Sequence, residues 1–148
     1  MDKINQLPLT KTSLDGKVPP ILITAMFFLS GFHKLINFDK TVNNFKGKIS
    51  YALNINQNIN EYIYNYIIYA VIVLEILAPV IIVYYHTTGK FRIFSNYAVY
   101  GLIFFTILAT LLYHPLNIND YYKSIPFWAN ISLIGGLLLL FKKSNIKN

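Results

Sequence analysis

The chain has 148 residues, of which 55% are hydrophobic and only 13% are charged. A soluble domain of this length usually carries about a quarter charged residues, so the composition predicts one membrane-embedded domain. The chain contains no cysteine, which excludes a disulfide, a thiol relay or a cysteine metal site within it. The net charge of +7 does not indicate nucleic-acid binding, because most lysines lie in tails and short loops beside apolar runs.

The first part of the chain combines a polar lead with an apolar run. Residues 1–17 are polar and are expected to form a cytoplasmic tail. The apolar run over residues 18–38 begins with two prolines, which suit a first helical turn. No small-residue cleavage site follows it, so we expect an uncleaved helix rather than a signal peptide. In the long loop that follows, apolar residues at helical spacing over 41–53 predict a short amphipathic helix at the membrane interface.

The next apolar run, residues 62–85, is 24 residues long. At about 1.5 Å per residue it is long enough to cross a bilayer. Its one carboxylate is Glu75. Burying this charge at that depth costs roughly a few kcal/mol unless the carboxylate is paired, protonated or in contact with water. Pro79 follows one turn later, removes a backbone donor and crowds the carbonyl of Glu75. We therefore predict a kinked or loosened helix beside the carboxylate.

Two further apolar runs, residues 94–114 and 125–141, precede a basic tail at 142–148. The sequence thus predicts an all-α, polytopic membrane protein, with an antiparallel bundle of four transmembrane helices over residues 18–141. Four spans place both termini on one side. Eight Lys and Arg residues then lie on the side of the termini and four in the opposite loops, which predicts cytoplasmic termini.

This topology brings polar side chains to similar depths in the outer half of the bundle. Lys34 lies near the outer end of the first helix, and His114 ends the third helix at the same face. Asn130 is about 8 Å into the fourth helix, and Glu75 is deeper. Such groups are expected to face inward and meet. The candidate polar site comprises Ser30, His33, Lys34, Glu75, Thr110, His114 and Asn130.

Each of these residues also has a purely structural interpretation. Lys34 can extend to the headgroups, and a pair with Glu75 can serve only to lock two helices together. His114 can be an interfacial residue, Asn130 can bond between helices, and Thr110 can bond the backbone of its own helix.

Helix packing is assigned to small residues and one proline. Gly31 would let a neighbouring helix approach closely, and Gly135 and Gly136 would form a close-packing patch on the fourth helix. Pro79 completes the set of packing residues. No metal site is expected, because the three histidines show no ligand spacing.

Four short motifs follow one another along the chain: SGFHKLINF at 30–38, LEILAP at 74–79, YH at 113–114 and WANISLIGGLLLL at 128–140. Together they resemble the DoxX family of small four-helix membrane proteins, over about residues 21–141. The resemblance implies a four-helix membrane bundle. By this resemblance, the motif positions of the family correspond here to Ser30, Gly31, Lys34, Glu75, His114 and Asn130.

The resemblance leaves the function open, because DoxX-like proteins are associated with quinone-linked oxidation and distant relatives act as cargo receptors or assembly chaperones. Here Pro79 stands where a small residue is more usual, and the outer loop is rich in Asn.

Three functions therefore compete. The first is a non-catalytic accessory, scaffold or assembly subunit, because no complete catalytic set is visible. The second is a quinone-associated redox subunit that uses Lys34, Glu75 and His114, with quinone as its cofactor. The third is a small proton-conducting or transport bundle built on Glu75. Expected partners are the lipid bilayer and either another membrane protein or a second copy of the chain.

Overall fold

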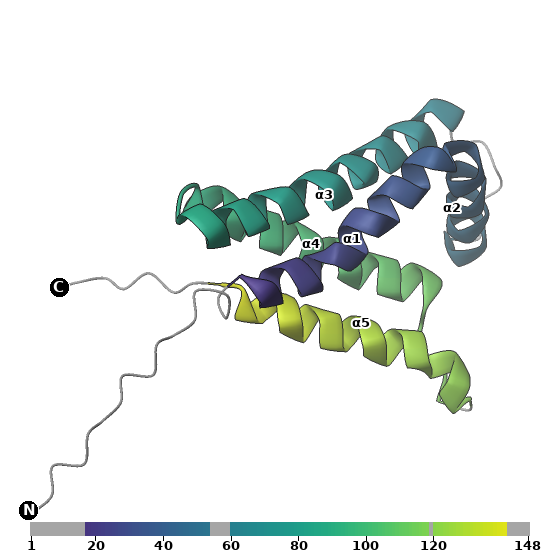
Figure 1. The fold of residues 1–148 in the computed structure, drawn as a ribbon. Coiled ribbons are helices and arrows are strands. Elements are labelled where there is room, and N and C mark those ends of the chain that lie inside the picture. The colour runs from purple at the N-terminus through teal and green to yellow at the C-terminus, as the bar shows by residue number, and fades with distance from the viewer. Residues whose placement is uncertain (1–16, 54–59, 119, 142–148) are drawn as a thin grey trace, which may run out of the picture.

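The computed structural model describes residues 17–53, 60–118 and 120–141, which form helices and short connections without any strand. This part of the chain forms five α-helices (Figure 1). They are α1 (Val18–Ile36), α2 (Phe38–Leu53), α3 (Glu61–Thr88), α4 (Arg92–Tyr113) and α5 (Tyr121–Leu139). The all-α prediction is confirmed. The predicted basic tail and nearly all of the predicted N-terminal tail lie outside the described residues.

Among the described residues, three helices are long and apolar enough to cross a membrane: α1, α3 and α4. A membrane-embedded, multi-pass protein is therefore supported. The predicted fourth span, α5, has 19 residues but is not among these three helices. Ser124, Asn130 and Ser132 lie within it and lower its hydropathy. The amphipathic helix predicted over 41–53 corresponds to α2.

The ends of α3 follow from its flanking residues. The Asn60 side chain accepts a hydrogen bond from the Tyr62 backbone N–H at 3.2 Å and so caps the first turn. Gly89 follows the last turn with φ 74°, the left-handed conformation that glycine adopts without steric cost. Between these ends α3 remains helical through Pro79, so the predicted loosening beside Glu75 does not interrupt the helix.

The start of α5 differs from the prediction, which placed it at residue 125. The helix begins at Tyr121, because Asp120 Oδ1 accepts a hydrogen bond from the Lys123 N–H at 3.3 Å and caps the first turn. The Ser124 hydroxyl also donates to the Asn117 carbonyl at 2.6 Å, which ties the first turn to the preceding loop. Pro126 therefore lies inside α5 rather than in its first turn.

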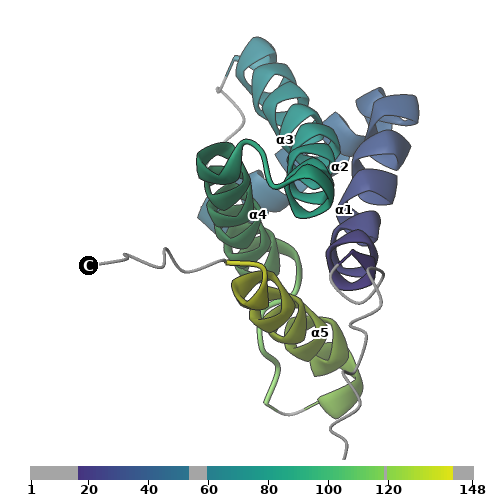
Figure 2. The same cartoon turned by 60° about the vertical axis from the view of Figure 1, so that its left-hand side comes forward.

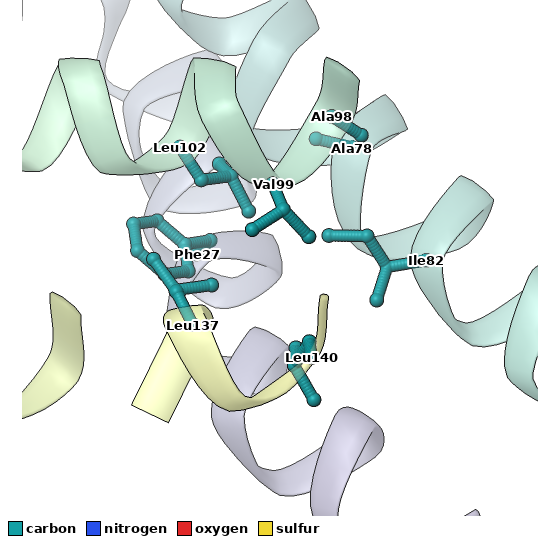
Figure 3. Close-up of a cluster of buried hydrophobic side chains, with 8 residues drawn as sticks. All are labelled: Phe27, Ala78, Ile82, Ala98, Val99, Leu102, Leu137 and Leu140. Atoms are coloured by element: carbon teal, nitrogen blue, oxygen red, sulfur yellow. The ribbon is translucent and has the colours of Figure 1, made fainter. Parts of the chain in front are cut away.

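Two clusters of buried side chains hold the helices together. The larger joins α1, α3, α4 and α5 near the end where α3 and α5 terminate (Figure 3), and consists of Phe27, Ala78, Ile82, Ala98, Val99, Leu102, Leu137 and Leu140. The smaller holds α2 against α3 and consists of Val42, Tyr64, Ile68 and Ile72. We call the end with the larger cluster the closed end. The opposite end, where α1 and α4 terminate and α2 runs crosswise, is the loop end (Figure 1).

The helices alternate in direction, as the two views show (Figures 1 and 2). α1 packs along α3, α4 packs against α3, and α5 packs mainly against α4. α5 makes few contacts with α1, and its central part contributes no buried side chain between Ser124 and Leu137. The bundle is thus tightly packed at the closed end and less so along the middle of α5.

Candidate functional site

The site is built around an ion pair between α1 and α3. The Lys34 Nζ atom lies 2.7 Å from both carboxylate oxygens of Glu75, whose side chain is almost fully buried. Lys34 Nζ also donates to the Ser30 hydroxyl at 2.6 Å, and that hydroxyl donates to Glu75 Oε1 at 3.2 Å. A lysine ammonium has three N–H donors, and these contacts use all of them. Lys34 therefore has no donor left for another partner in this arrangement.

The sequence places this pair through helical spacing and one glycine. Ser30 and Lys34 lie one turn apart, so they share a face of α1. Gly31 lies against α3: a Cβ atom added there would meet Glu75 Cβ and Ile76 Cγ1, each at 2.9 Å. A side chain at this position would therefore push the two helices apart. The close approach predicted for Gly31 is present.

The glycines of α5 behave differently. A Cβ atom added at Gly135 would meet nothing within 4 Å, and one added at Gly136 would meet Ile23 at an ordinary 3.6 Å. The predicted close-packing patch is therefore wrong at Gly135, while Gly136 makes a normal contact with α1. The physical reason is that none of the described residues packs against α5 at Gly135.

A cavity of about 410 Å³ lies beside the ion pair. This volume falls within the range of about 300–1,000 Å³ that small-molecule sites occupy. Every helix of the described chain contributes to its lining, and most of the lining is apolar. The polar lining residues are Ser30, Lys34, Thr41, Glu75, Thr106, Tyr113, His114 and Asn130.

The predicted site residues divide into two groups. Ser30, Lys34, Glu75, His114 and Asn130 all line the cavity, although they come from three helices and the loop after α4. The remaining two do not line it: Thr110 and His33.

Thr110 is buried, and its hydroxyl donates to the Thr106 carbonyl at 2.6 Å, which is the structural interpretation given above. His33 is exposed on another face of α1. Pro79 is buried in α3 and is not among the cavity residues.

Three polar side chains of the cavity wall make no hydrogen bond to another described residue: the Tyr113 hydroxyl, the His114 ring and the Asn130 amide. All three can donate and accept hydrogen bonds, the neutral imidazole through its two nitrogens. The cavity therefore combines apolar walls and an internally satisfied ion pair with three groups that can bind a polar atom.

Several residues of the cavity wall were not predicted from the sequence. Lys34 Nζ lies 5.7 Å from the ring centroid of Phe105, a cation–π contact that covers the ammonium. Nothing in the sequence distinguishes Phe105 from the other apolar residues of its run. α2 contributes Thr41 and Phe45 to the lining, and here the helical spacing of its apolar residues was a usable signal. Among the described residues, no group of three or more His, Cys, Asp or Glu could hold a metal ion.

Comparison with known proteins returns no relative, since no protein-family model, no curated protein and no solved structure matches the chain. The site is therefore interpreted from its own geometry.

Proposed function

We propose that the protein is an integral membrane bundle in which α5 crosses the bilayer together with α1, α3 and α4. Leu137 and Leu140 join the common core at the closed end, and 19 residues of helix span about 28 Å, close to the hydrocarbon thickness. α2 lies at the interface of the loop end, with Val42 buried against α3. The basic residues near the closed end favour a cytoplasmic location for both termini.

The bundle acts as a non-catalytic subunit whose cavity holds a small, neutral, lipid-soluble molecule with a carbonyl or hydroxyl group, of which a quinone headgroup is an example. The observation that carries this proposal is the position of Asn130 and His114, two unbonded polar groups on the wall of an apolar cavity of ligand size. A neutral ligand is favoured because Lys34 and Glu75 balance each other's charge, and a charged ligand would be costly to bury there.

The proposed roles differ from those that the sequence suggested. Lys34 is occupied by Glu75 and Ser30, so the ion pair positions α1 against α3 and shapes the cavity. Hydrogen bonds to the ligand come from Asn130 and His114. The chain has no cysteine for an iron–sulfur cluster and no dinucleotide-binding glycine motif, so a partner subunit would supply any electron transfer.

Replacing Asn130 by Leu is expected to remove bound ligand while the bundle remains folded. Loss of one hydrogen bond and a polar group costs about 1–1.5 kcal/mol, or about tenfold in affinity. Native mass spectrometry with lipid extraction on protein in mild detergent measures the occupancy. The matched control is Ser132→Leu, an exposed position on α5 whose hydroxyl bonds only the Trp128 carbonyl.

Equal occupancy in wild type and N130L would contradict the proposed site. A wild-type protein that carries no small molecule but retains a membrane-protein partner would instead support a scaffold role without a ligand.

A further inference from the structure

A second hollow, of about 700 Å³, lies at the loop end. Its lining consists of Tyr113, His114, Pro115, Leu116, Asn117, Ile118 and Lys123. Two of these residues, Tyr113 and His114, also line the cavity beside the ion pair. The two spaces therefore adjoin at the residues where α4 ends.

The two shared side chains are held differently. Tyr113 is partly buried, and Lys48 Nζ from α2 lies 5.9 Å from its ring centroid, so a contact from another helix covers its ring. His114 follows the last helical residue, with φ −136° and ψ 54°, and precedes Pro115. Its ring is exposed and makes no hydrogen bond to a described residue. His114 is thus the side chain that can turn aside.

The other directions offer no polar route within the described residues. Toward the closed end, Ile82, Val99, Leu102 and Leu137 have no exposed surface, and they fill the space between the helices (Figure 3). Toward the sides, the exposed lining residues include Met26 and Leu108. An opening there would face lipid and would admit apolar molecules only.

We propose that water and small polar solutes reach the cavity from the loop end, through the second hollow and past His114. This route depends on the membrane embedding of the bundle and not on the nature of the ligand. Water that follows this route would reach as far as the Lys34–Glu75 pair. Contact with water reduces the free-energy cost of burying charged side chains within a membrane.

The natural absence of cysteine allows a direct test with single-cysteine variants in proteoliposomes. A109C places a thiol at a half-buried position on the cavity wall. The control is A98C, the same substitution on the same helix but within the closed-end core. We expect a charged, membrane-impermeant methanethiosulfonate reagent to modify A109C at least about tenfold faster than A98C, because thiol reactivity follows access.

The reagent is applied separately to each side of the membrane. Modification of A109C only from the side that also modifies I118C, a position in the second hollow, is the expected result. Equal rates for A109C and A98C would overturn the route. Modification of A109C only by a lipid-soluble maleimide would also overturn it, in favour of access from the bilayer.

A bulky residue at position 114 tests the role of His114. In the A109C background, His114→Trp is expected to slow modification about tenfold, since access limits the reaction. The matched control is His33→Trp, which makes the same change at an exposed residue that lines neither hollow. An unchanged rate with His114→Trp, in a variant that elutes from gel filtration like the wild type, would overturn the assignment of His114. Because His114 is also a proposed ligand contact, the effect of His114→Trp on the rate is measured again in the Asn130→Leu background, where loss of the ligand is already expected; a slower rate there reports access alone.

Discussion

Replacing Lys34 by Met is expected to lower the free energy of unfolding by about 3–5 kcal/mol, because it leaves the Glu75 carboxylate buried without its partner. Glu75 is 1% exposed, and Ser30 alone would then donate to it. The effect is measured as the shift of the unfolding transition in mixed detergent and SDS micelles. Adding Glu75→Gln to the Lys34→Met variant is expected to recover most of the loss, because the double variant no longer buries a charge.

The matched control is Lys123→Met, which breaks an exposed ion pair with Asp120. Lys123 Nζ lies 3.1 Å from Asp120 Oδ2, but the lysine side chain is 71% exposed. Exposed pairs contribute about 0–1 kcal/mol, so this variant should unfold close to the wild type. If Lys34→Met proved as mild as Lys123→Met, the ion pair could not be the main link between α1 and α3.

Replacing Gly31 by Ala is expected to destabilise the bundle by about 1–3 kcal/mol, since overpacking forces neighbouring groups to move. The new Cβ atom would lie 2.9 Å from Glu75 Cβ and from Ile76 Cγ1. Glu75 Cβ is bonded directly to the backbone of α3 and cannot rotate away, and the Glu75 carbonyl carbon would lie 3.3 Å from the new atom, so α1 itself would have to shift. The same SDS unfolding assay measures the effect.

Gly135→Ala provides the opposite expectation at a helical glycine with open space around it. Alanine is favoured over glycine in a helix by about 1 kcal/mol, so this variant should be neutral or slightly more stable. Equal destabilisation by both substitutions would mean that a second copy of the chain or another protein covers the Gly135 face.

Much of the fold could be predicted because apolar runs dominate the sequence. Lys34 and Glu75 were placed at compatible depths by counting residues from the helix ends, and in the structure they lie 2.7 Å apart. That inference works because a charged side chain within an apolar run is stable only where it meets an opposite charge or water.

Other features depend on contacts that the sequence does not display. The prediction began α5 at residue 125, whereas Asp120 caps the helix one turn earlier. The saturation of Lys34 by Ser30 and Glu75 follows from rotamers and could not be inferred from spacing. Gly31 and Gly135 look alike in sequence, and only the position of the neighbouring helix separates them.

The pairing of Lys34 with Glu75 also has a consequence for how the protein is made. The two residues are 41 positions apart, and translation at about 5–20 residues per second separates their synthesis by roughly 2–8 s. During that interval α1 carries the Lys34 ammonium without a carboxylate to neutralise it. The Glu75 carboxylate becomes available only when α3 has been made. The ion pair can therefore form only after α3 has been synthesised, and until then α1 lacks the partner that neutralises its charge.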